Sequence, residues 1–141
     1  MENSEVDLAL ITTLTQSFRY MKVNPQIVEV RYQPFKNSIK KQCYNNSFRY
    51  LTQEHGNDVR YIMGYLFLYK TIPIDHAFVR VGTEYLEITV KPGPDDIHVS
   101  LVEITRQELL DYVVDNNHAP DLFSYNRWLA ERARKSKDYK S

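Results

Sequence analysis

The chain is short of several features, and each shortage excludes a class of protein. It has one cysteine in 141 residues, so an internal disulfide is impossible. No apolar run approaches the roughly 20 residues that a membrane-spanning helix needs. The 18 basic and 18 acidic residues give a formal net charge of zero. This balance argues against nucleic-acid binding, which depends on neutralising phosphates.

Motifs for bound metals and phosphates are also missing. His55, His98 and His118 are scattered, and no His-x-His or Cys-x-x-Cys pair supplies the spacing of a zinc site. Neither Gly-x-x-x-x-Gly-Lys nor Gly-x-Gly-x-x-Gly occurs, so no phosphate-binding loop is expected. The sequence therefore predicts a protein that uses no metal and no cofactor.

The order of periodic segments is typical of an α+β domain with a largely antiparallel sheet. The length suits one domain with one core. Thr105 to Glu108 form a capping box, which predicts the start of a helix. The predicted core covers residues 26–104, with flanking helices at about 4–21, 105–114 and 120–135.

Cys43 stands near the start of a predicted helix, and this position favours reactive chemistry. The unpaired N–H groups and the dipole of a helix N-terminus stabilise a thiolate. Lys40 and Lys41, just upstream, add positive charge. The same N–H groups can form an oxyanion hole for an acyl-transfer reaction. Cys43 is therefore a candidate nucleophile.

A predicted hairpin at residues 73–90 carries two candidate partners for this thiol. With its turn at Gly82-Thr83, Glu87 in the second arm comes near His76 in the first. His76 would then take the proton of the thiol, and Glu87 would orient the imidazole. The structural alternative remains open: a buried cysteine, a hydrogen-bonded strand histidine and a solvated glutamate are common in proteins.

Four short motifs in chain order resemble a known group of proteins. The segments are QCYNNSFRYL, VRYIMGYLF, PIDHAFV and YLEIT, which span residues 42–89, about a third of the chain. They resemble uncharacterised phage and bacterial proteins with the pattern Cys-x-x-Asn-Ala, Tyr-x-x-Gly-Tyr, Pro-x-x-His-Ala-Trp and Asp-x-Thr. That group is similar to the papain-like superfamily, and closest in motif order to transglutaminase-like cysteine enzymes.

The resemblance implies a papain-like fold and acyl transfer at an amide or ester, with a protein or peptide-like substrate. A thiolate attacks the carbonyl, a thioester forms, and the acyl group passes to water or an amine. Protease, isopeptidase, deamidase and transglutaminase share the first half of this reaction, and the sequence leaves them open. The implied residues are a catalytic triad of Cys43, His76 and Glu87, supporting Asn46 and Thr89, and Gln42 as an oxyanion donor by its adjacency to the cysteine.

The chain departs from the pattern of the group at three positions: Ser47 replaces alanine, Phe78 replaces tryptophan, and Glu87 replaces aspartate. The second hypothesis is therefore a non-catalytic phage or bacterial binding protein whose groove holds a host protein or a small ligand. The N-terminus has early acidic residues and no basic segment, unlike a signal peptide. The predicted location is the cytoplasm, or the host cytoplasm if a phage encodes the chain. The oligomeric state stays open.

Overall fold

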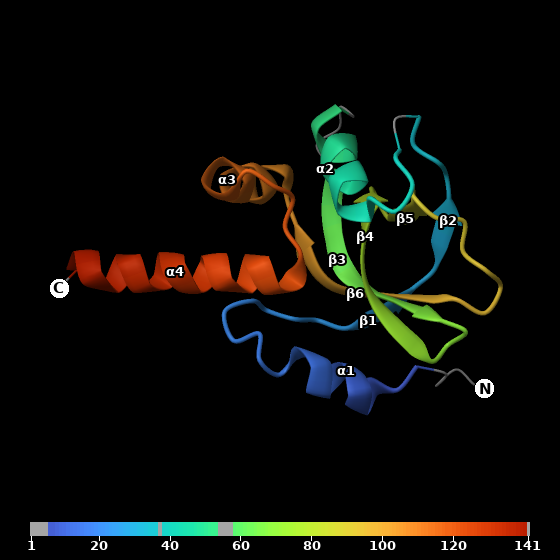
Figure 1. Cartoon of the computed structure of the whole chain (residues 1–141), viewed down its shortest axis with the longest axis horizontal. Coiled ribbons are helices and arrows are strands. Elements are labelled where there is room, and N and C mark those ends of the chain that lie inside the picture. The colour runs from blue at the N-terminus through green and yellow to red at the C-terminus, as the bar shows by residue number, and fades with distance from the viewer. Residues whose placement is uncertain (1–5, 37, 54–57, 141) are drawn as a thin grey trace.

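The structure, a computed structural model, describes residues 6–36, 38–53 and 58–140, with side chains described as far as residue 136. These residues form an α+β fold of four helices and six strands (Figure 1), which confirms the α+β class and the largely antiparallel sheet of the prediction. The helices are α1 (Leu8–Thr15), α2 (Cys43–Gln53), α3 (Arg106–Asn116) and α4 (Leu122–Lys140). The strands are β1 (Gln26–Val28), β2 (Val30–Tyr32), β3 (Val59–Leu68), β4 (Ile72–Val81), β5 (Glu84–Glu87) and β6 (Ile97–Ile104).

The strands form one curled sheet in the order β1-β6-β3-β4-β5-β2. Every neighbouring pair is antiparallel except β2 and β5, which are parallel. The two edge strands, β1 and β2, follow each other in the chain with only Glu29 between them, so the chain itself joins the two edges. The sheet therefore curls round on itself and has an inner and an outer face.

The outer face carries the main hydrophobic core, and the helices cover it. Burying each large apolar side chain contributes about 1.5–3 kcal/mol. The Tyr61 hydroxyl lies in this core and donates a hydrogen bond of 2.6 Å to the Pro120 carbonyl, which ties β3 to the start of α4. Core members include Met63, Ala77, Val79 and Leu101 from the sheet and Leu51, Leu109, Tyr112 and Trp128 from the helices.

The inner face holds a second, smaller set of buried residues. Ile62 and Phe78 are completely buried but do not belong to the main core. Neighbouring residues of a strand point to opposite faces, so these two side chains point into the curl of the sheet. The buried polar side chains His76, Glu87 and His98 lie with them. The protein thus encloses a polar group inside its sheet.

Local signals in the sequence agree with several of these elements. The predicted turn at Gly82-Thr83 separates β4 from β5, and Gly82 has a φ of 61°, which suits glycine. The Thr105 side chain accepts from the Glu108 N–H, and the Glu108 side chain accepts from the Thr105 N–H. The predicted capping box is confirmed.

Two helices differ in length from the predicted ranges. The helix expected at 4–21 is shorter in the structure, where only α1 at Leu8–Thr15 is helical in this range. It begins after Asp7, whose side chain accepts a hydrogen bond from the Leu10 N–H. Residues 4 and 5 lie outside the described part. Its threonines, such as Thr12, are weak helix formers whose hydroxyls bond back to carbonyl groups. The helix expected at 120–135 starts two residues later and continues to Lys140 as α4.

Candidate functional site

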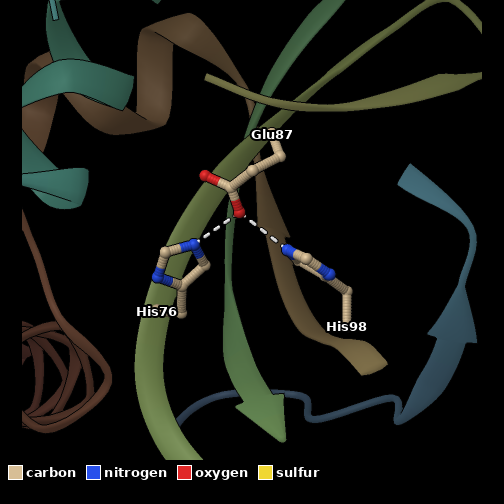
Figure 2. A group of neighbouring side chains, drawn as sticks. All are labelled: His76, Glu87 and His98. Carbon is tan, nitrogen blue, oxygen red and sulfur yellow. Dashed lines mark hydrogen bonds and ion pairs between the residues drawn. The ribbon is translucent and has the colours of Figure 1, made fainter. Parts of the chain in front are cut away.

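The Glu87 carboxylate, at the end of β5, is the centre of the polar group on the inner face. It is completely buried and accepts four hydrogen bonds. Oε1 accepts from Nε2 of His76 at 2.6 Å and from Nε2 of His98 at 2.7 Å (Figure 2). Oε2 accepts from the backbone N–H groups of Thr89 and Val90, each at 3.1 Å. These four donors hold the carboxylate in one orientation.

The hydrogen bonds keep Glu87 ionised in spite of its burial. Burial raises the pKa of Glu87, but the hydrogen bonds and charges of His76 and His98 outweigh it and lower the pKa to about 2. An ionised carboxylate can only accept hydrogen bonds, so both Nε2 atoms carry a proton. The predicted contact between His76 and Glu87 is therefore present, with the imidazole as donor.

His76 lies in the middle of β4 and has a raised pKa. Burial lowers the pKa of His76, but the influence of the Cys43 side chain and the hydrogen bond and charge of Glu87 raise it to about 9. The ring is therefore protonated near neutral pH. Its second nitrogen, Nδ1, points away from Glu87 (Figure 2). Since Nε2 is bound to the carboxylate, Nδ1 is the nitrogen left to face the thiol.

Cys43 is the first residue of α2 and is partly exposed. After burial, the Cys43 side chain is the largest influence on the pKa of His76. Within the described residues, however, no hydrogen bond joins the Cys43 sulfur to a buried histidine or glutamate. Catalytic hydrogen bonds are often long or poorly aligned in enzymes without substrate.

Asn46 and Thr89 connect the cysteine helix to the buried carboxylate. The Asn46 side chain donates to Thr89 Oγ1 at 3.0 Å and to the Ile39 carbonyl at 2.8 Å, and it accepts from the Ile39 N–H at 2.8 Å. Thr89 in turn donates its N–H to Glu87. A chain of hydrogen bonds thus runs from α2 to Glu87, which is the kind of support that the sequence assigns to Asn46 and Thr89.

The segment before Cys43 turns sharply into the helix. Lys41 has a φ of 66°, which is uncommon for a residue other than glycine. Such strained backbone persists where the surrounding structure enforces it, and it is frequent at functional sites. Gln42 is exposed, and its side chain accepts a hydrogen bond of 3.4 Å from Asn45. Its role as an oxyanion donor stays a prediction.

His76, Glu87 and His98 are also the kind of group that can hold a metal ion, with ligand atoms all within 4.8 Å of one another. In the described arrangement, the three side chains lie closer together than the ligands of a bound zinc ion do. Zinc bonds of about 2.0–2.1 Å in a tetrahedral site place ligand atoms about 3.4 Å apart. The observed nitrogen–oxygen separations of 2.6 and 2.7 Å match charge-assisted hydrogen bonds instead. We therefore describe the three residues as a hydrogen-bonded group.

His98 is the residue that sequence reasoning missed. The sequence analysis treats His98 as an isolated histidine outside any site. This prediction is wrong, because the curl of the sheet brings β6 to Glu87. The alternation in β6 places His98 and Ser100 on one face, and such polar faces are usually exposed to solvent. One signal was available: His76 and His98 each lie 11 positions from Glu87.

No protein-family model, curated protein or solved structure matches this chain. The likeness to papain-like proteins therefore rests on the four motifs alone. None of the helices in the described ranges combines the length and the apolar character that crossing a membrane requires.

Proposed function

We propose that the chain is a papain-like cysteine enzyme that transfers acyl groups from an amide or ester. Cys43 is the nucleophile, His76 is the general base and acid, and Glu87 orients the imidazole. One observation carries the proposal: the buried, ionised Glu87 binds Nε2 of His76, which leaves Nδ1 for a thiol at the N-terminus of a helix. Catalytic histidines are usually oriented in this way, with one ring nitrogen bound to a carboxylate and the other turned to the reacting group.

The charges of the site suit the first chemical step. His76 is protonated near neutral pH, so it pairs with a Cys43 thiolate. The sulfur attacks the carbonyl carbon, a C–S bond forms, and the oxygen becomes an oxyanion that N–H groups at the start of α2 can stabilise. The C–N bond of an amide or the C–O bond of an ester then breaks, and the leaving amine or alcohol takes the Nδ1 proton of His76.

The second step regenerates the enzyme. Water or an amine attacks the thioester carbonyl and gives a proton to Nδ1 of His76. The C–S bond breaks, and the thiolate again pairs with the protonated ring. The acyl group leaves as an acid when water attacks, or as a new amide when an amine attacks. The substrate class is an amide or ester of a protein or peptide.

Alkylation of the thiol tests the proposal without knowledge of the substrate. Cys43 is the single cysteine, so the mass increase of the whole protein with iodoacetamide reports this residue alone. We expect rapid labelling of the wild type down to about pH 6, because a protonated His76 stabilises the thiolate. His76→Ala should lower the rate at pH 6 by about tenfold or more and move the profile to higher pH.

The control is His118→Ala, which changes an exposed histidine between α3 and α4 and should leave the profile unchanged. Slow labelling of the folded wild type at every pH, with no response to His76→Ala, would overturn the enzyme proposal and favour the binding-protein hypothesis. A stoichiometric zinc ion in the purified protein, lost in His98→Ala and in His76→Ala, would overturn it in favour of a metal centre.

A further inference from the structure

His98 reaches the candidate site from the other side of the curled sheet. It lies on β6, and strands β3 and β4 separate β6 from β5, which carries Glu87. Its side chain is nearly inaccessible to solvent, with 2% exposed, and Nε2 donates to Glu87 Oε1 at 2.7 Å. Its ring packs edge-on against His76, with 5.7 Å between centroids, and against Phe78 at 5.1 Å.

We propose that His98 is a positioning residue, which holds Glu87 Oε1 in place and through it fixes the His76 ring that serves Cys43. This inference rests on the proposed function and extends the triad to four residues. Oε2 of Glu87 is already fixed by backbone N–H groups. Oε1 has two side-chain donors, His76 and His98, so the removal of His98 leaves His76 as its single side-chain partner.

The geometry in Figure 2 explains how His98 acts on a ring that it does not bind. The two imidazoles approach the same oxygen from different strands, and the carboxylate lies between them. With one donor removed, the carboxylate can swing towards the other, and the ring of His76 can follow it. A ring that moves no longer presents Nδ1 to Cys43 in one direction, so the reactivity of the thiol falls.

Two acidic residues share a cavity with His98. Glu29 and Asp96 line, together with His98, a cavity of about 370 Å³ between the β1–β2 bend and the loop before β6. On the inner side His98 faces Glu87 and His76. A smaller side chain at position 98 would change this cavity as well as the hydrogen bond. The test therefore uses replacements of similar size.

The experiment compares His98→Phe with His98→Gln in the full chain. Phenylalanine keeps the bulk of the ring and removes the donor, whereas glutamine places an N–H group near the position of Nε2. We expect His98→Phe to lower the alkylation rate of Cys43 at pH 6 by about tenfold, the effect of one lost hydrogen bond to a charged group. His98→Gln should stay within about threefold of the wild type.

His118→Phe is the matched control for the same substitution at an exposed site, and it should label like the wild type. If His98→Phe does not fold, His98→Asn replaces it, because asparagine places its N–H group nearer Nδ1 and should label more slowly than His98→Gln. A His98→Phe or His98→Asn protein that labels as fast as the wild type, while His76→Ala labels slowly, would refute the role of His98 and leave the proposed function intact.

Nuclear magnetic resonance of the ring nitrogens separates the two proposals. The chain has four histidines, so the signals of His76 can be assigned by substitution. We expect the titration of the His76 ring to shift in His98→Phe, because its carboxylate partner loses a donor, and to stay in place in His98→Gln and His118→Phe. If the alkylation rate of Cys43 is the same in His76→Ala and the wild type, the enzyme proposal fails. If the His76 ring titrates at the same pH in His98→Phe and the wild type, the positioning role of His98 is refuted separately.

Discussion

Glu87→Gln is the substitution that tests the buried site most directly. The carboxylate of Glu87 accepts four hydrogen bonds, from His76, His98, Thr89 and Val90. Glutamine has nearly the same shape but replaces one oxygen by an NH₂ group, which donates and cannot accept. Whichever way the amide turns, one pair of donors loses its acceptor. The substitution therefore changes the chemistry at constant volume.

The magnitude follows from these hydrogen bonds. A hydrogen bond to a charged group contributes about 1.5–3 kcal/mol, and a buried donor without a partner costs a similar amount. Two such bonds are at stake at Oε1, but an imidazole can lose its proton and accept from the new NH₂ group, which recovers part of the loss. We expect Glu87→Gln to lower the free energy of unfolding by about 2–4 kcal/mol near pH 6.

The loss should depend on pH in a defined direction. The pKa of His76 is raised from 6.5 to about 9, so its stabilising contribution is complete below pH 6.5 and disappears as the pH rises through 9. The pKa of Glu87 is lowered from 4.5 to about 2, so its contribution is complete above pH 4.5 and disappears as the pH falls through 2. The two shifts describe largely one interaction, and it is strongest between pH 4.5 and 6.5.

Urea unfolding at pH 5.5, 7.5 and 9.5 measures this effect, with the fluorescence of Trp128, the single tryptophan, as the signal. With an m-value of about 2 kcal/mol per M, the midpoint at pH 5.5 should fall by about 1–2 M in Glu87→Gln. The control is Glu84→Gln in the same strand, which breaks an exposed ion pair with Arg31 and should change the midpoint little. Equal midpoints for the two variants at pH 5.5 would refute the reasoning.

Two further substitutions test the frame of the site. Gly64→Ala should lower the free energy of unfolding by about 2 kcal/mol or more, because a Cβ there would lie 1.9 Å from the Val99 carbonyl oxygen of β6. The control is Gly93→Ala, whose Cβ would lie 3.3 Å from the side chain of Asp96. Equal melting temperatures of the two variants would contradict the close approach at Gly64. Asn46→Ala should cost about 2–3 kcal/mol and slow the alkylation of Cys43, since the link from α2 to Thr89 is lost, whereas exposed Asn45→Ala should do neither.

The sequence predicts those parts of the fold that depend on neighbouring residues. The hairpin turn at Gly82, the capping box at Thr105 and the strand at 97–104 all carry local signals, and the structure has each of them. Gly64 is another example: a glycine within a strand indicates a bulge or a close approach, and the pairing of β3 with β6 shifts between Met63 and Gly64. The pair of His76 and Glu87 follows from the hairpin register in the same way.

The curl of the sheet was beyond local reasoning. Residues 26–35 read as one strand, and nothing near Glu29 shows that β1 pairs with β6 while β2 pairs with β5. Strand partners are set by contacts between residues that are distant in sequence. The free energy of these contacts must offset the entropy lost when the long loops between them close. Without that closure the polar face of β6 looks exposed, so His98 was assigned no role. Its burial depends on a contact that the sequence does not display.

The cost of the buried polar group is itself an argument for function. An ionised carboxylate without solvent loses several kcal/mol of hydration, and well-packed apolar residues would often make the same core equally stable or more stable. Ile62 and Phe78 show that the inner face accepts apolar side chains at neighbouring positions. The charges of Glu87 and His76 are therefore not needed to fill the sheet. Strongly shifted pKa values in a buried group are a common mark of a chemical site, and the proposed enzyme would use these charges at the nitrogen of His76 that Glu87 does not bind.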